Sequence, residues 1–375
     1  MGTPFKRTQA VIVGAGPAGD AVAAGLRDGG FQGDVTIVGA EPAAPYERPH
    51  LSKGYLLGTV PRGRLPLRPA AQYSELAIDL MLGERVVDFG VESHAAVLAS
   101  GRTLAWDRLC IATGSDARRL PGFDDAIYLR ELPAAERLLG VISQQKALDI
   151  VGAGFIGCEV AAAARQRGCE VRVYELLAQP LLRVLGPGLG AYLAAVHRSH
   201  GVDLRLGATA LPEKPTLVAV GSAPRDVRDV DELGRTSTPD VFAAGDGVRF
   251  FHPLYGTHIR VEHFQTSQRQ GFAVGRTMAG APQAYDEVPW FWSDQYDLNI
   301  QYAGAGLPWD EIVIRGKLGA PPFTVFYLRG GELIAAAGVN DHHTIARARH
   351  VMQARRAITR SQMEDPGFDL RRALA

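Results

Sequence analysis

Two glycine-rich segments are the parts of this chain whose residue types and spacing most clearly indicate chemistry. Residues 14–19 read GAGPAG and residues 152–157 read GAGFIG. In such a segment the first glycine permits a tight turn, the second lets the backbone approach a pyrophosphate, and the third lets a helix pack against a strand. The N–H groups at the start of the following helix can then bind phosphate oxygens. We therefore predict two dinucleotide sites, one formed by Gly14, Gly16, Ala18 and Gly19 and the other by Gly152, Gly154 and Gly157.

An acidic residue follows each glycine segment at the distance that a ribose ligand requires. Glu41 and Glu175 each lie about 20 residues beyond the last glycine of their segment, after a predicted strand. A carboxylate at this place accepts hydrogen bonds from free ribose hydroxyls and repels the 2′-phosphate of NADPH. Because no arginine directly follows Glu175, we expect the second site to bind NADH rather than NADPH.

A third segment, AAGD, ends a short predicted strand at Asp246. Such a strand end can direct a carboxylate at the ribityl hydroxyls of a flavin, although taken alone it could equally be an ordinary β-turn. Two dinucleotide sites in one chain indicate electron transfer between two dinucleotides. The usual pair is FAD and a nicotinamide, and these cofactors carry the redox chemistry themselves.

The elements that must position these residues are two β-α-β units. Residues 9–13 and 35–38 are predicted strands on either side of a helix, and residues 148–151 and 170–174 repeat this pattern. Short antiparallel strands are expected within residues 79–104. From about residue 288, aromatic-rich strands precede an arginine-rich helix, which is typical of an α+β domain.

The predicted fold class is therefore α/β, with two Rossmann-type domains and a C-terminal α+β domain. The predicted domains are an FAD-binding domain (residues 1–115 and 225–287), a shortened NADH-binding domain (116–224) and a C-terminal interface domain (288–375).

Composition excludes several other functions. A chain of 375 residues exceeds one compact core. Its formal net charge is zero, which gives no reason to expect nucleic acid or membrane as a partner. No apolar run reaches the length of a membrane-spanning helix, and the N-terminus does not resemble a signal peptide, so we expect a cytoplasmic protein. The spacing of the three cysteines fits neither a metal site nor a redox pair, and no metal is predicted.

The order of the segments resembles the two-dinucleotide-binding flavoproteins. The resemblance is strongest to the FAD-dependent NADH:ferredoxin reductases of Rieske dioxygenase and P450 systems, with apoptosis-inducing factor more distant. It rests on VIVGAGPAG, YERPHLSKGYL, CIATGSDARRLPG, DIVGAGFIGCEVAAAA, RTSTPDVFAAGD, VEHFQTSQRQG and VPWFWSDQYDLNIQ, which are spread over nearly the whole chain. It implies an enzyme, a monomer or homodimer, that takes a hydride from NADH and passes single electrons to a [2Fe-2S] ferredoxin.

The resemblance also implies roles for individual residues. Lys53 would lie near the flavin N5, and Glu159 would lie near the nicotinamide amide; both are candidate catalytic residues. The further FAD contacts that it implies are Arg48, Thr113, Gly114, Arg118, Asp246 and Trp292. Other interpretations stay open, because Lys53 could be a solvated loop residue, Glu159 a solvent-facing helix residue and Trp292 a core aromatic.

The missing cysteine pair excludes the related disulfide reductases. The chain departs from the family pattern in two places. The NADH-binding domain is short, because only GATALPEKPT joins the strands at residues 204–206 and 217–220, and no helix is expected within 221–230. Phe264 also stands where the family often has tryptophan.

Two other functions remain possible from the sequence. One is a flavin-dependent oxidase or biosynthetic oxidoreductase with impaired NADH binding, and the other is a non-catalytic FAD-binding interaction protein. If the chain is a reductase, its ferredoxin is expected to be acidic and to dock on a basic face. The candidate docking residues are Arg62, Arg64, Arg68, Arg249 and Arg260.

Overall fold

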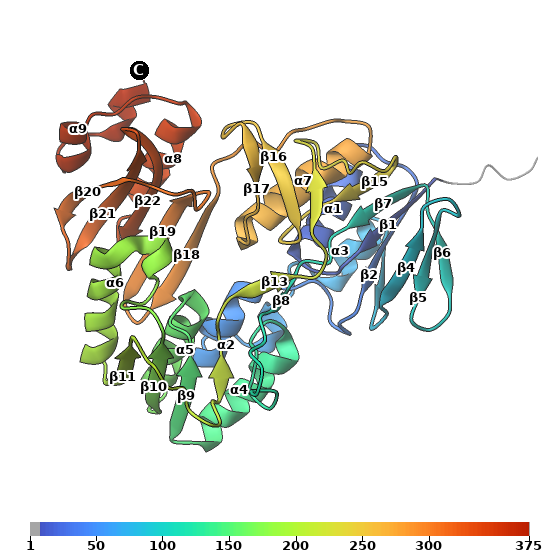
Figure 1. The fold of residues 1–375 in the computed structure, drawn as a ribbon. Helices are drawn as coiled ribbons and strands as arrows, with labels where there is room; N and C mark the ends of the chain where they lie inside the picture. Colours follow the sequence, from blue (N-terminus) through green and yellow to red (C-terminus); the bar gives the residue numbers. More distant parts are fainter. Residues whose placement is uncertain (1–7, 375) are drawn as a thin grey trace, which may run out of the picture. The chain divides into compact units, whose positions relative to one another are not determined.

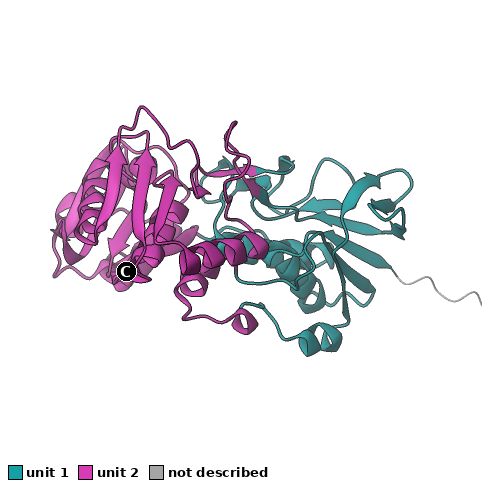
Figure 2. Cartoon of the chain, turned by 90° about the horizontal axis from the view of Figure 1, so that it is seen from below, with its two compact units in different colours: residues 1–47, 65–115, 224–287 teal, residues 48–64, 116–223, 288–375 magenta. Residues whose placement is uncertain are grey.

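The computed structural model describes residues 8–374. Figure 1 shows the helices and strands of the chain, and Figure 2 colours its two compact units. Unit 1 comprises residues 8–47, 65–115 and 224–287, and unit 2 comprises residues 48–64, 116–223 and 288–374. Residues 1–7, where no signal peptide is expected, lie outside the described residues. None of the helices within residues 8–374 is long and apolar enough to cross a membrane.

Unit 1 is built on a five-stranded parallel sheet in the order β15-β7-β1-β2-β3. These strands are β1 (Gln9–Val13), β2 (Asp34–Gly39), β3 (Ile78–Leu82), β7 (Arg108–Ile111) and β15 (Val241–Ala243). Valine, isoleucine and leucine fill the strands, because a parallel sheet is usually covered on both faces. The antiparallel arrangement predicted from residue 79 onward is wrong for β3. This strand follows α3 (Ala70–Glu75) and pairs in parallel with β2.

Helices α1 (Pro17–Asp28) and α7 (Phe264–Met278) pack closely in unit 1. Glycines at their contact make this possible, since a Cβ on Gly275 would lie 2.1 Å from the Val22 carbonyl oxygen. Val22 and Val274 belong to one buried core together with Ile12 of β1.

Two smaller sheets complete unit 1. One contains β4 (Val86–Gly90), β5 (Ala95–Leu98) and β6 (Thr103–Ala105), which are antiparallel as predicted. The other contains β14 (Arg228–Val230), β16 (Val248–His252) and β17 (Thr257–Ile259). The central segment of unit 2 begins within β8 (Ser115–Ala117) and ends within β13 (Ser222–Pro224), and these two strands pair with each other.

Unit 2 contains a four-stranded parallel sheet in the order β11-β10-β9-β12. Its strands are β9 (Ala147–Val151), β10 (Glu170–Glu175), β11 (Val202–Leu206) and β12 (Leu217–Val218). Its helices are α4 (Leu132–Gln144), α5 (Phe155–Gln166) and α6 (Leu182–Ser199). Residues 207–216, between β11 and β12, form neither helix nor strand. The short segment η1 (Arg48–Ser52), helix α2 (Gly54–Leu57) and η2 (Arg62–Arg64) also belong to this unit.

The C-terminal part of unit 2 is a five-stranded antiparallel sheet in the order β18-β19-β22-β21-β20. The strands are β18 (Trp290–Gln295), β19 (Leu298–Gly304), β20 (Glu311–Lys317), β21 (Ala320–Arg329) and β22 (Glu332–Val339). They are followed by α8 (His342–Gln353), α9 (Arg360–Glu364) and η3 (Leu370–Leu374). The predicted α/β class, with two parallel nucleotide-type sheets and a C-terminal α+β part, is confirmed.

Candidate functional site

The first glycine segment lies in unit 1, between β1 and the N-terminus of α1. Gly14 has a φ of 123°, and a Cβ there would lie 2.2 Å from the Ala112 carbonyl oxygen. A Cβ on Gly19 would lie 1.9 Å from the Gly14 carbonyl oxygen, whereas a Cβ on Gly16 would meet no atom within 4 Å. Packing therefore requires Gly14 and Gly19, while Gly16 leaves open space at the helix N-terminus. This is the arrangement that a pyrophosphate needs.

The second glycine segment repeats this division of roles in unit 2. Gly152 has a φ of 101°, and a Cβ there would lie 2.4 Å from the Ala219 carbonyl oxygen. A Cβ on Gly157 would lie 2.0 Å from the Gly152 carbonyl oxygen. At Gly154 the nearest atom would be 3.9 Å away, so the space in front of α5 is open. Each unit thus carries one glycine cradle with the open space that a pyrophosphate requires.

The two acids predicted to bind ribose are held in place by hydrogen bonds. Glu175, at the end of β10, accepts from the backbone N–H groups of Ala153 and Leu177, both at 2.8 Å. The Tyr46 hydroxyl donates to Glu41 at 2.6 Å. A carboxylate offers about four acceptor positions. Glu175 therefore keeps acceptor capacity for ribose hydroxyls.

Several predicted flavin-binding residues meet at one edge of the unit 1 sheet. Gly14, Thr113 and Asp246 follow β1, β7 and β15, which are parallel neighbours in the sheet. Gly114 comes directly after Thr113. Ligands of open parallel sheets bind at the carboxyl ends of the strands. Asp246 is buried and accepts from Ser267 Oγ at 2.8 Å, which fixes its carboxylate.

Unit 2 contains the other predicted flavin contacts. The Arg48 side chain donates to the Arg130 carbonyl at 2.8 Å. The Arg118 backbone N–H follows β8 and donates to the Gly221 carbonyl. Trp292 lies on β18, half-buried, with its ring 6.0 Å from that of Trp290. Trp292 is thus not a fully enclosed core residue and keeps surface for a ligand.

The most distinctive cluster in unit 2 surrounds Glu159, on helix α5. Lys53 Nζ lies 3.0 Å from Glu159 Oε2, and the two side chains are only 10% and 4% exposed. The Ser52 hydroxyl donates to the same oxygen, and the Ser293 hydroxyl donates to Oε1 at 2.6 Å. A solvated lysine and a solvent-facing glutamate are therefore the wrong interpretations of these two residues. Three donors, one of them charged, hold the carboxylate in place.

The local sequence explains how this cluster is assembled. Lys53 stands between η1 and α2, and its ammonium also lies 3.3 Å from the Pro49 carbonyl oxygen. Helix α5 is rich in alanine after Glu159, which lets neighbouring elements approach its backbone. The ring of Phe155 meets that of Phe291 edge-on at 4.7 Å, joining the start of α5 to β18.

Sequence reasoning did not identify Ser52, Ser293 or the residues beyond them as part of the site. The segment WSDQ nevertheless contains a pattern that indicates a buried polar network. Ser293 and Gln295 are two positions apart on β18, so they point to the same face, and both are buried. Buried polar groups require partners, so two of them on the inner face of a strand indicate a polar network.

The arginines predicted to form a docking face do not share one environment. The Arg68 guanidinium donates to buried Asp20 at 2.8 Å, and the Arg68 side chain is only 23% exposed. Arg62 pairs with Glu136 at 3.0 Å. The remaining ion pairs are Arg249 with Asp229 and Arg260 with Glu262. Arg64, on η2, is exposed.

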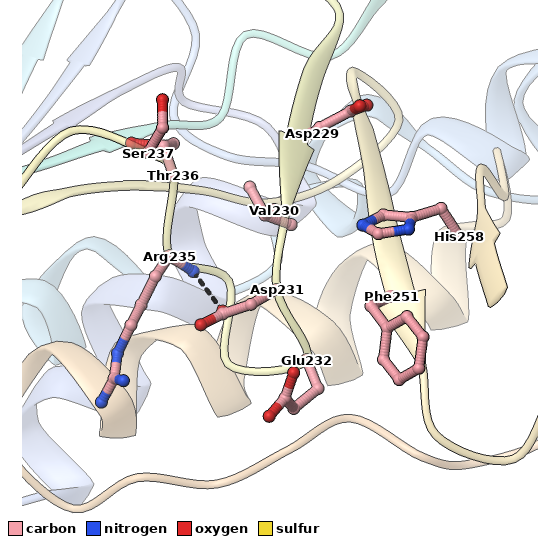
Figure 3. Close-up of a pocket in the computed structure, with 9 residues that line it drawn as sticks. All are labelled: Asp229, Val230, Asp231, Glu232, Arg235, Thr236, Ser237, Phe251 and His258. Atoms are coloured by element: carbon pink, nitrogen blue, oxygen red, sulfur yellow. Dashed lines mark hydrogen bonds between the residues drawn. The ribbon is translucent and has the colours of Figure 1, made fainter. Parts of the chain in front are cut away.

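Unit 1 also has an acidic pocket of about 540 Å³, shown in Figure 3. Its walls come from β14, β16, β17 and the loop after β14, and none of its lining residues belongs to a glycine segment. Two of its three acids are already engaged, because Asp229 pairs with Arg249 and Asp231 accepts from backbone N–H groups. The lining therefore shares no residue with the predicted dinucleotide sites.

Comparison with known proteins identifies the family of this chain. Residues 8–214 match the family model "Pyridine nucleotide-disulphide oxidoreductase", and residues 290–374 match "Reductase C-terminal". The chain is 36% identical to the anthranilate 1,2-dioxygenase system ferredoxin–NAD(+) reductase component of Burkholderia cepacia, over 96% of this chain and 98% of that protein. It is 33% identical to rhodocoxin reductase of Rhodococcus erythropolis, over 97% and 94% of the two chains.

A solved structure of putidaredoxin reductase in covalent complex with putidaredoxin is also similar. Its TM-score is 0.92 at 30% identity, with 98% of both chains covered. The alignment with the anthranilate reductase spans 397 positions, more than the 375 residues of this chain, so that relative contains segments that are absent here. The predicted enzyme class, FAD and NADH are confirmed. The chain belongs to the pyridine nucleotide-disulphide oxidoreductase family, among its ferredoxin reductases.

Proposed function

We propose that this chain is the FAD-dependent NADH reductase that passes single electrons to a [2Fe-2S] ferredoxin of a Rieske or P450 oxygenase system. The observation that carries this proposal is the buried Lys53–Glu159 pair, which belongs to the same unit as the second phosphate-binding cradle. Burying an ion pair is costly, and here the hydroxyls of Ser52 and Ser293 help to offset that cost. The named relatives, which are ferredoxin reductases of oxygenase systems, support the same activity.

The residues of unit 1 fit the requirements of FAD. The open N-terminus of α1 at Gly16 would bind the pyrophosphate, and Glu41 would accept from the adenosine ribose. Asp246 would hold the ribityl chain, since Ser267 already fixes its carboxylate. The further unit 1 contacts in the proposal are Thr113 and Gly114, and the proposal also includes Arg48, Arg118 and Trp292 of unit 2.

The residues of unit 2 fit the requirements of NADH. The N-terminus of α5 would bind the second pyrophosphate, and Glu175 would accept from the ribose. Glu159 has acceptor capacity beyond its three donors and would face the nicotinamide amide. Bound FAD supplies the hydride acceptance and the one-electron transfer. The protein contributes binding, orientation and the positive charge of Lys53.

Rapid anaerobic mixing of the holoprotein with NADH tests the first half of this function. NADH should bleach the visible band of oxidised flavin, and NADPH should do so much more slowly because Glu175 repels its 2′-phosphate. Flavin that stays oxidised with NADH would overturn the assignment. It would favour an oxidase, or a binding protein without turnover.

The second half concerns the partner. A [2Fe-2S] ferredoxin added to the NADH-reduced protein should be reduced, with a rate that falls as salt rises if basic residues guide docking. Reduction of free dye without any reduction of ferredoxin would contradict the proposed partner. The proposal includes a monomer or homodimer in a reducing cytoplasm, and sedimentation measures which of the two assemblies forms.

A further inference from the structure

A line of hydrogen bonds leads away from Glu159 through unit 2. Ser293 Oγ donates to Glu159 at 2.6 Å, and Gln295 Nε2 lies 3.1 Å from Ser293 Oγ. His197 Nε2, on helix α6, lies 3.0 Å from Gln295 Oε1. On its other side, His197 Nδ1 lies 3.1 Å from the Tyr296 hydroxyl. Five side chains from α5, β18, its following turn and α6 are thus joined in one row.

The carboxylate fixes the direction of every bond in this row. A carboxylate only accepts, so the single hydrogen of Ser293 points at Glu159 and its oxygen must accept from Gln295. The amide nitrogen of Gln295 therefore faces Ser293, and its carbonyl oxygen faces His197. That oxygen needs a donor, so the hydrogen of a neutral His197 must be on Nε2. The bare Nδ1 then accepts from the Tyr296 hydroxyl.

The surroundings of His197 agree with a neutral ring. Burial lowers the pKa of His197 to about 4, and nearby His200 lowers it as well, while the bond to Gln295 acts in the opposite direction. Burial also raises the pKa of Tyr296, so its hydroxyl keeps its hydrogen. The ring of His200 stacks on that of Tyr296 at 3.7 Å, which holds the outer end of the row.

We propose that His197 is a positioning residue for the Lys53–Glu159 pair. Its Nε2–H tautomer orients the Gln295 amide, which in turn makes Ser293 a donor to Glu159. If the amide turned over, its oxygen would face Ser293 and compete for the serine hydrogen. The Ser293 oxygen lone pairs would then face the carboxylate, and Glu159 would move or lose its hold on Lys53. The structural part of this proposal stands alone; its effect on turnover rests on the proposed function.

The tautomer can be measured without using activity. Holoprotein labelled with ¹⁵N-histidine gives separate signals for protonated and bare ring nitrogens, and the His197→Gln variant identifies the signals of His197. We expect the neutral Nε2–H form throughout the range of about pH 6 to 8. An Nδ1–H tautomer, or protonation within that range, would overturn the proposal.

The effect on the ion pair is measured by rapid reduction of the flavin with NADH. His197→Phe removes the donor to Gln295 and should slow reduction about tenfold, the loss that corresponds to one hydrogen bond to a charged group. His197→Gln restores a donor near the Nε2 position and should stay within about twofold of the original protein. His343→Gln, at an exposed histidine on α8, is the matched control for histidine replacement.

The outcomes separate the positioning role of His197 from the proposed reductase function. If the unmodified protein is reduced by NADH and His197→Phe is equally fast, His197 does not position the pair. If NADH fails to reduce the unmodified protein, the proposed function fails, and the tautomer measurement still decides the direction of the row. Ser293→Ala removes the last donor directly. It should show the same loss, and it replaces His197→Phe should that variant not fold.

Discussion

Removing one partner of the Lys53–Glu159 pair should destabilise the protein more than removing both. At 3.0 Å, two unit charges attract by about 5.5 kcal/mol at an effective dielectric constant of about 20. Desolvation offsets most of that attraction in the intact pair. A variant that leaves one charge buried alone keeps the desolvation cost without the attraction and loses about 3 kcal/mol or more.

The surroundings of the two charges predict an asymmetry between the single variants. Lys53→Met leaves Glu159 with the hydroxyl donors of Ser52 and Ser293. Glu159→Gln removes the opposite charge and leaves the Lys53 ammonium beside the Pro49 carbonyl at 3.3 Å. Glu159→Gln should therefore be the more destabilising of the two. The double variant should be more stable than Glu159→Gln alone, because neither charge remains.

Thermal unfolding of the holoprotein measures these differences. A loss of about 3 kcal/mol in a unit of this size corresponds to a fall in Tm of roughly 6 to 12 °C. Asp229→Asn is the matched control, because its pair with Arg249 is exposed and should leave Tm nearly unchanged. Two results would refute the reasoning. One is a Tm of Glu159→Gln equal to that of the original protein. The other is a double variant whose fall in Tm equals the sum of the falls in the single variants.

Three further predictions concern the cradles, the choice of coenzyme and pH. Gly16→Ala should weaken FAD binding while the apoprotein stays folded. Gly19→Ala should also lower the Tm of the apoprotein, because its Cβ would clash with backbone. Equal apoprotein Tm values for the two variants in calorimetry would contradict this prediction. Glu175→Ala should narrow the preference for NADH over NADPH in steady-state kinetics, and an unchanged ratio of kcat/KM values would argue against its ribose role. Because the pKa of His197 is lowered from 6.5 to about 4, the unfolded chain binds more protons between these values, so stability should fall as pH drops across that window. The fall in stability with pH should be shallower in His197→Gln. Parallel profiles of Tm against pH for the two proteins would contradict the lowered pKa of His197.

The parts of the site that were predictable are those with a local pattern. The spacing of Gly14, Gly16 and Gly19 defines a turn and a helix start within six residues, and the acids follow after one strand. The position of β3 was not predictable from its own residues, because its parallel pairing depends on β2, more than 30 residues earlier. The same holds for the contacts of Arg68, whose partner Asp20 lies 48 positions away.

The hydrogen-bonded row was even less predictable from local sequence patterns. His197 and Ser293 are both ordinary polar residues in their own segments. They become a network only because α6, β18 and α5 converge in unit 2, with partners 98 and 134 positions apart in the sequence. No local pattern contains that information. The alternation of Ser293 and Gln295 could have indicated a buried polar face, although not its partners.

The close packing of α1 against α7 has a consequence for the order in which the protein can mature during synthesis. Helix α1 leaves the ribosome early, but its glycine-lined partner lies at residues 264–278, after the whole of the central segment of unit 2. The core around Ile12 and Val22 also includes Val274 and so stays incomplete until then. Domains usually mature in the order of synthesis. Here the parallel sheet of unit 2 can form first, and the cradle at Gly14 should acquire its cofactor only late in translation.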